Sequence, residues 1–400
     1  MPLVGMAQNR AQNGQNAARG NSNAKGEDDV DPCVDLVDDR LYWTLDPLTG
    51  IMHYQVPDTS YQSLAFHNTM AGQATAVLST GNLFSPHIVE DYFNRHKDND
   101  LLFLNAYQLF IPHQEDLLYR STKVPYTVIG YTTSGSNMQS NDRLRIDFAG
   151  NVNKQVGLGT SLDYVYARGD YMGSATKPLK WTSYAYYNGD RYKAAANYSL
   201  IKLANQENGG IQDSTHILTP DKYDHTYTDP KTMPVNLADT WNDIDAWNVH
   251  LNHNYDLGVW NEQVNPEDST DVWDEFTSVA SIFHSVDFEH YDHTFRMDKG
   301  ADQTDARDYF KNHYINKELT NDSTAYSSFS TYAGIRLNEG FNRWSQFGIS
   351  AFIGYQHQSY TMMQDTLKLD FIARSHSSNN FFLGGQLSRQ QSKHFKFDAP

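Results

Sequence analysis

Apolar and polar residues alternate along most of the chain from about residue 124 onward. Residues 143–166 read RLRIDFAGNVNKQVGLGTSLDYVY, two alternating arms on either side of the polar break NVNKQ. A period of two predicts β-strands, and the break predicts a turn, so we expect this stretch to form a β-hairpin. The hairpin alone leaves open whether its apolar face meets a soluble core or the lipid around an outer-membrane barrel.

The same alternation predicts a series of strands, most of about 8–14 residues, with no long helix between them. They are 124–132, 142–152, 156–168, 179–187, 191–203, 246–257, 276–295, 324–337, 343–358, 366–374, 380–388 and 393–398. The first connections are alternately short, at 153–155 and 188–190, and long, at 168–178 and 204–245. Tight turns at one end and long loops at the other are typical of outer-membrane barrels. The connection 258–275 is longer than this rule requires.

The strands are also long enough to cross a membrane. Ten steps of about 3.3 Å separate Val156 from Tyr166, which at a tilt of about 45° gives a rise of roughly 23 Å. The apolar band of outer-membrane barrels is about 25 Å tall, whereas strands of soluble proteins average about five or six residues. Pattern and length together predict an all-β, antiparallel transmembrane barrel.

This fold assigns a role to each face of the strands. We expect the apolar positions to face lipid: Leu144, Ile146, Phe148, Leu158, Leu162, Tyr164 and Tyr166. We expect the polar neighbours to line the pore: Arg143, Arg145, Asp147, Asp163, Arg191, Lys193, Asn197, His250 and Asn252. Charges of both signs across a channel would tune its ion selectivity.

The N-terminal part of the chain divides by composition into three segments. Residues 1–7, with Gly5 and Ala7 at spacing that a signal peptidase reads, predict the remnant of a signal peptide and therefore export. Residues 8–30 are rich in Asn, Gln, Ala and Gly and predict a disordered linker. Residues 31–120 are irregular and could be periplasmic, plug-like or the first barrel strands, before a barrel at 121–400.

Three motifs in this irregular segment predict local structure. DRLYWTL and GIMHYQV predict short strands around the turn DPLTG. SPHIVEDYFNRH predicts a short helix with Ser85 as its cap and Pro86 at its first position. DLLFLNAYQLFI is compatible with either strand or helix.

Charge and hydropathy narrow the function classes. The formal net charge of -17 argues against nucleic-acid binding, which needs a basic surface. The hydrophobic fraction of 39% and mean hydropathy of -0.65 resemble a soluble protein. A membrane barrel is compatible with these values because only every second residue of a strand must be apolar. The single cysteine, Cys33, excludes an intramolecular disulfide.

Three stretches resemble the family of putative porins, outer-membrane proteins of Bacteroidota-type bacteria: 78–93, 125–171 and 192–211. The resemblance rests on Gly81, Asn82, Leu83, Ser85 and Pro86, on the turn Asn151, Asn153 and Lys154, on Arg168, Gly169 and Tyr171, and on the run 207–211. It implies an outer-membrane barrel that contacts lipid and lipopolysaccharide, the barrel-assembly machinery and small hydrophilic solutes, with no cofactor. The chain ends in KHFKFDAP rather than in the terminal aromatic expected of this family, so we expect a barrel that is truncated at its C-terminus.

Other chemistry has weaker support in the sequence. His290 and His293 lie three apart, on opposite faces of a strand, which is unsuitable for one metal ion. The acidic stretch 298–308 lacks the spacing of a calcium loop, and a hydrolase would depend on a pair such as His357 and Ser359. We therefore predict neither a metal site nor an enzyme. A TonB-dependent transporter would need a globular plug, for which residues 31–120 are short.

The sequence thus predicts a porin-like channel for passive diffusion of small hydrophilic solutes. A second hypothesis is a non-conducting barrel that acts as an adhesin or surface-binding protein through its long outer loops. A third is a soluble secreted β-protein.

Overall fold

A computed structural model describes the chain from Arg40 to Ala399, with gaps. The described residues are 40–55, 76–92, 101–135, 139–222, 229–237, 239–264, 272–297, 309–310, 320–340, 346–365, 371–389 and 397–399. The predicted signal remnant, the predicted linker and the acidic stretch 298–308 lie outside these residues.

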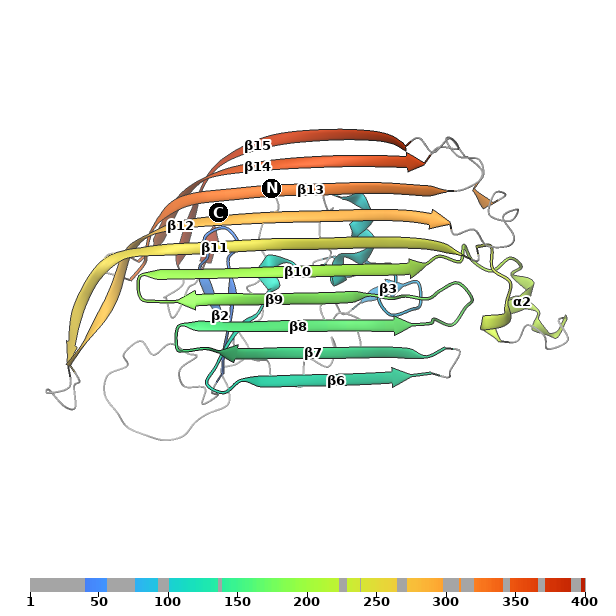
Figure 1. Cartoon of the computed structure of the whole chain (residues 1–400), viewed down its shortest axis with the longest axis horizontal. Helices are drawn as coiled ribbons and strands as arrows, with labels where there is room; N and C mark the ends of the chain where they lie inside the picture. Colours follow the sequence, from blue (N-terminus) through green and yellow to red (C-terminus); the bar gives the residue numbers. More distant parts are fainter. Residues whose placement is uncertain are drawn as a thin grey trace.

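An antiparallel sheet of eleven strands dominates the structure (Figure 1), with its strands in sequence order from β6 to β16. They are β6 (Tyr126–Ser134), β7 (Asn141–Asn151), β8 (Val156–Ala167), β9 (Leu179–Asn188), β10 (Tyr192–Gln206), β11 (Thr240–Val264), β12 (Val272–Met297), β13 (Asn321–Leu337), β14 (Gly348–Asp365), β15 (Phe371–Arg389) and β16 (Phe397–Ala399). Each strand pairs with the next along the chain, the simplest order that hairpins can produce.

The hairpin at 143–166 is confirmed, with β7 and β8 paired from Asn141↔Ala167 to Asn151↔Gly157. The side chain of Asn153 shapes its turn by accepting hydrogen bonds from the backbone N–H groups of Gln155 and Val156, at 2.8 and 2.7 Å. Such an Asx turn closes a tight connection, as the polar break predicted.

Two predicted boundaries were wrong. The connection predicted at 258–275 is largely strand, because β11 and β12 continue pairing to Val264↔Val272 past a bulge at Leu257/Gly258. Figure 1 shows this ribbon extending beyond the other strands. The two strands predicted at 366–374 and 380–388 are a single strand, β15, because its serine- and asparagine-rich middle pairs along β14 without a break.

The N-terminal segment forms a second, smaller body. The predicted strands around DPLTG are confirmed as β1 (Arg40–Leu45) and β2 (Met52–Gln55), and β5 (Tyr119–Thr122) pairs with β1 to complete a three-stranded sheet. The other elements before the large sheet are β3 (Val77–Ser79), β4 (His87–Val89), and the 3₁₀ helices η3 (Leu102–Phe110) and η4 (Gln114–Asp116). None of these strands joins the eleven-stranded sheet in the described part of the chain.

The helix predicted from Ser85 was wrong. Phe84 adopts a left-handed φ of 58°, and His87–Val89 pairs with Val77–Ser79 as a short hairpin. The Ser85 hydroxyl donates to the carbonyl of Asn82 at 2.7 Å instead of capping a helix. The stretch DLLFLNAYQLFI, for which strand and helix both remained open, is helical as η3.

The helices in the connection from β10 to β11 are short. They are α2 (Thr215–Leu218), η5 (Pro220–Lys222) and η6 (Pro230–Thr232). No helix in the described ranges is long and apolar enough to span a membrane.

The N-terminal segment packs on one face of the large sheet through two apolar clusters. Phe84, Leu104 and Phe110 of this segment pack with Leu203 and Ile244 of the sheet. In the second cluster, the side chains come from both bodies: Trp43, Leu45, Tyr119, Tyr184, Tyr186 and Ala195. Burial of each large side chain contributes about 1.5–3 kcal/mol, so the two bodies form one structure.

Candidate functional site: the polar face of the sheet and the segment that covers it

The strand register sorts the predicted pore-lining residues onto one face of the sheet, called here the polar face. Arg145 is opposite Asp163, and Asn197 is opposite His250. Side chains alternate between faces along a strand, so the other predicted lining residues within strands lie there too: Arg143, Asp147, Lys193 and Asn252. Arg191 is the exception because it precedes β10, in the turn, and its guanidinium lies 5.5 Å from the centre of the Phe276 ring.

Charges of both signs gather on the polar face of β7 to β9. Arg143 donates two parallel hydrogen bonds to the Asp163 carboxylate, at 2.9 and 2.6 Å. Lys180 is opposite Asp163 on the next strand, which the sequence analysis did not include. Arg120, from β5 of the N-terminal segment, lies 3.6 Å from Asp147. The Arg143 guanidinium is held in one orientation because both of its hydrogen bonds go to the Asp163 carboxylate.

The middle of the polar face is covered. Asn197, His250 and Asn252 are nearly fully buried, although the pattern predicted them to line a pore. The Asn197 amide donates to Gln114 Oε1 at 2.7 Å and to the Tyr119 hydroxyl at 3.2 Å, both in the N-terminal segment. Burial raises the pKa of Tyr119 to about 12, so its hydroxyl stays protonated at neutral pH.

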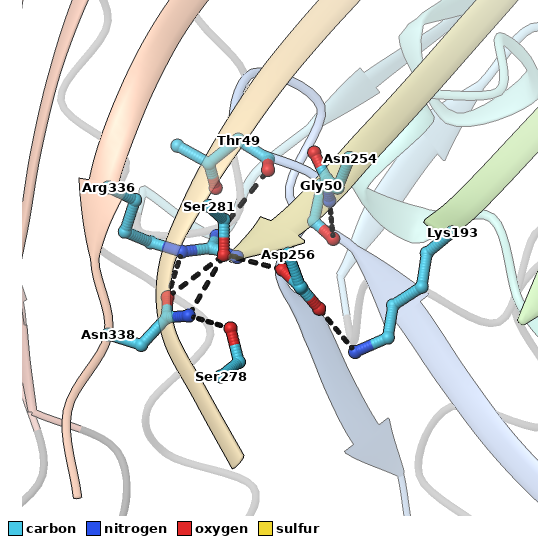
Figure 2. Close-up of polar contacts among 9 residues, drawn as sticks. All are labelled: Thr49, Gly50, Lys193, Asn254, Asp256, Ser278, Ser281, Arg336 and Asn338. Carbon is cyan, nitrogen blue, oxygen red and sulfur yellow. Dashed lines mark hydrogen bonds and ion pairs between the residues drawn. The ribbon is translucent and has the colours of Figure 1, made fainter. Parts of the chain in front are cut away.

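A polar network attaches the turn between β1 and β2 to the sheet (Figure 2). Asn254 donates to the carbonyl of Gly50 at 3.2 Å, and Arg336 donates to the carbonyl of Thr49 at 3.5 Å. Asp256 is nearly buried and lies 3.2 Å from the Lys193 ammonium. Figure 2 shows that Ser281 links Arg336 to Asp256, both directly and through Asn338. The Asn338 amide also donates to the Ser278 hydroxyl.

The turn is shaped to fit this attachment. The Asp46 carboxylate accepts hydrogen bonds from the N–H groups of Leu48 and Thr49, at 3.0 and 2.8 Å. Gly50 has a φ of +66°, and a Cβ there would overlap the side-chain oxygen of Asn252. A residue without a side chain is therefore required where the turn approaches β11.

The polar face also carries an apolar patch that was not predicted from the sequence. Ile201 and Leu203 on β10, with Ile244 and Ala246 on β11, are buried at positions that would otherwise carry polar side chains. The signal was present, since residues 200–204 read LIKLA, apolar on both faces of one strand. A strand buried on both faces has this composition, and here η3 is the cover.

The opposite face of the sheet, called here the apolar face, carries the predicted lipid-facing residues. Leu144 is opposite Tyr164, and Ile146 is opposite Leu162. The same face continues across the sheet to Ile353, which is 64% exposed. The remaining predicted members, Phe148, Leu158 and Tyr166, follow the same register. Their contact with lipid remains a prediction.

The signature of the family described as Putative porin matches residues 40–400. The chain belongs to the putative porin family. Its eleven-stranded, hairpin-connected sheet, with an apolar and a polar face, is that of an outer-membrane β-barrel. Membership of this family and the two-faced sheet identify the chain as an outer-membrane β-barrel protein.

Solved structures similar to this putative porin include the ferric yersiniabactin uptake receptor FyuA from Yersinia pestis, at 11% identity and a TM-score of 0.31, covering 69% of this chain and 46% of that chain. The ferric citrate transporter FecA in its unliganded form matches at 8% identity and a TM-score of 0.30, covering 79% of this chain and 48% of that chain. The putative porin thus spans about half the length of either structure. No curated protein matches the sequence.

The structure also places the histidines of the other chemical candidates. His357 Nδ1 is 2.7 Å from the side-chain oxygen of Asn379. His290 and His293 are in register with Trp247 and Ile244, which lie on opposite faces of β11. Across the described ranges, no group of three or more His, Cys, Asp or Glu side chains could hold a metal ion.

Proposed function

We propose that this putative porin is a channel for passive diffusion of small hydrophilic solutes along its polar face, past the N-terminal segment. The observation that carries the proposal is a set of buried polar atoms on β10 and β11 with no hydrogen-bond partner among the described residues. They are Asn197 Oδ1, His250 Nε2, Asn252 Nδ2 and Asn254 Oδ1. Buried polar groups are normally hydrogen-bonded. Water or hydroxyl-bearing solutes that pass between the sheet and the N-terminal segment would supply the missing hydrogen bonds.

The charges on β7 to β9 support the same proposal. Asp163 pairs with Arg143, while Arg145 on the same face is exposed. A narrow aqueous path beside the N-terminal segment would be lined by these charges of both signs, which would interact with passing ions and solutes. The opposite, apolar face supports membrane insertion around that path.

A second candidate is a non-conducting barrel that acts through its long connections as an adhesin or surface-binding protein. The observation that favours it is the burial of Asn197, His250 and Asn252 under the N-terminal segment. In this case the segment would seal the polar face rather than narrow it.

Single-channel recording of the purified chain in a planar bilayer distinguishes the two candidates. Stepwise conductance in potassium chloride, and osmotic swelling of vesicles that contain the protein in small sugars, are expected for the channel. Absence of both, with heat-modifiable gel mobility that demonstrates a folded barrel, would overturn the channel and favour the sealed form.

A further inference from the structure

A pocket of about 120 Å³ lies where the N-terminal segment meets the connections after β8 and β10. It is lined by residues of three separate stretches, among them Thr80, Asn82, Tyr171, Asn205 and Glu207. These stretches are the motifs on which the family resemblance rests, and they lie far apart in the sequence. Passive diffusion along the polar face does not explain why these three stretches come together.

Side-chain hydrogen bonds build the walls of this pocket. The Asn82 amide donates to the carbonyl of Ser174 at 2.8 Å and to that of Ala167 at 3.3 Å. The Thr176 hydroxyl donates to the carbonyl of Leu83 at 2.6 Å. Gly169 has a φ of +69°, and a Cβ there would lie 3.1 Å from the Asn82 amide nitrogen. The pocket is therefore held in shape by bonds that run across it between distant segments.

Asn205 lines the pocket and carries a buried, unused acceptor. Its side chain is only 2% exposed, and its amide donates to the Tyr107 hydroxyl at 3.0 Å. Its Oδ1 atom has no hydrogen-bond partner in the part of the chain that the structure describes. A buried, unsatisfied oxygen costs about 1–3 kcal/mol, which a ligand that donates a hydrogen bond would offset.

The neighbouring charges favour a neutral ligand. The carboxyl groups of Asp170 and Glu207 both line the pocket. The Lys231 ammonium donates to the carbonyl of Tyr171 at 3.0 Å, and the charge of Asp170 acts on it. Burial raises the pKa of Glu207, whose carboxylate accepts one long hydrogen bond, from the Asn242 amide at 3.4 Å, so a further donor would stabilise its charged form. Because the acceptors of Asp170 and Glu207 lie near the Lys231 ammonium, a ligand with neutral hydroxyl groups fits this pocket better than an anionic or a cationic ligand.

We propose that this pocket binds a neutral sugar, whose hydroxyl groups donate to Asn205 Oδ1 and to the Glu207 carboxylate. The pocket is several times larger than the roughly 10–15 Å³ that one water molecule needs, which gives room for a monosaccharide. It lies at the end of the sheet that carries the long connections, where a solute would first meet an outer-membrane barrel. The inference rests on the proposed function, because it names the solute class of that channel.

Isothermal titration calorimetry on the full chain in detergent tests the proposal. D-glucose, D-galactose and D-mannose are compared with D-glucosamine, which is cationic, and with D-glucuronate, which is anionic. Weak, saturable binding of at least one neutral hexose, tighter than that of either charged sugar, is expected. Asn205→Ala should weaken that binding about tenfold, the typical effect of one lost hydrogen bond.

Two further variants keep the test independent of folding. Thr80→Trp fills the pocket from its exposed rim without removing a buried group, and should abolish binding. Asn261→Ala is the matched control, since the Asn261 amide also donates to a hydroxyl, that of Thr277 at 2.8 Å, but on the ribbon of β11 and β12. It should bind as the unmodified protein does.

Three outcomes would overturn the sugar site. They are absence of saturable binding of all three neutral hexoses, tighter binding of a charged sugar, and unchanged binding in both Asn205→Ala and Thr80→Trp. Calorimetry needs no current, so its failure is separable from failure of the channel. Conductance without sugar binding removes only the site, and sugar binding without conductance removes only the channel.

Discussion

Asn254 on β11 donates a hydrogen bond to the carbonyl of Gly50, 204 positions earlier in the chain. Together with the bond from Arg336 to Thr49, it ties the β1–β2 turn to the sheet. This attachment and the apolar clusters hold the N-terminal segment over the polar face by different physical means, one directional and polar, the other non-directional.

Gly50→Ala is expected to detach the turn, because its left-handed φ is unfavourable for alanine and the new Cβ would overlap Asn252. The cost is about 1–3 kcal/mol. Limited proteolysis should cut residues 46–55 faster in the variant, and conductance should rise. Gly130→Ala is the control, since a Cβ at Gly130 meets no atom within 4 Å. Equal protease resistance in Gly50→Ala and the unmodified chain would contradict this account of the attachment.

Asp163→Asn is expected to shift ion selectivity toward anions. The substitution removes the carboxylate that faces Arg143 and leaves Arg145 and Lys180 on the same face. The measurement is the reversal potential in a potassium chloride gradient. Asp245→Asn removes an equal charge from the apolar face, where Asp245 lies 3.4 Å from Lys202, and should leave the potential unchanged. A shift toward cations in Asp163→Asn would refute the assignment of this group to the pore.

Leu162→Lys is expected to destabilise the inserted protein by about 2–4 kcal/mol, because it places a charge in the lipid near the middle of β8. Ser161→Lys is the control at the adjacent position, which faces Asp147 on the polar face. Urea titration of both variants in lipid vesicles measures the difference. Equal stability would show that the two faces do not differ in environment.

Acid is expected to loosen the N-terminal segment through His87. Its Nε2 accepts a hydrogen bond from the Leu109 N–H at 3.2 Å, and burial lowers its pKa to about 4. The unfolded segment, with a pKa near 6.5, therefore takes up a proton first as the pH falls. The contribution to stability is complete above about pH 6.5 and declines toward pH 4, by at most about 3 kcal/mol.

Hydrogen exchange of residues 101–111 across this pH range measures the effect. His87→Gln retains an acceptor but cannot be protonated, so its exchange should depend less on pH. If the variant and the unmodified chain showed the same pH dependence, another group would be responsible.

The eleven-stranded sheet was largely predictable from local pattern. Leu144, Ile146 and Leu162 alternate with charged or small residues. Side chains two positions apart share a face, so the pattern fixes both faces of the sheet unless the pairing of two strands shifts by an odd number of residues. Strand ends were less predictable, as in β11 and β12, because their continuation past Leu257 depends on pairing between the two strands.

The placement of the N-terminal segment was beyond local pattern. Ser85 and Pro86 carry a helix-start signal, yet the chain there forms a hairpin whose Val89 is buried in the cluster with Phe110. Burial of apolar area across the two bodies outweighs a local capping preference of about 1 kcal/mol.

The sequence by itself determined that the chain forms long, two-faced antiparallel strands, because side-chain alternation is a property of each strand alone. Only the tertiary structure decided that Asn197 and His250 lie under a cover, that Gly50 meets Asn252, and that three distant motifs enclose one pocket. These relationships depend on contacts between segments remote in the chain, and no period or spacing along the sequence encodes such contacts.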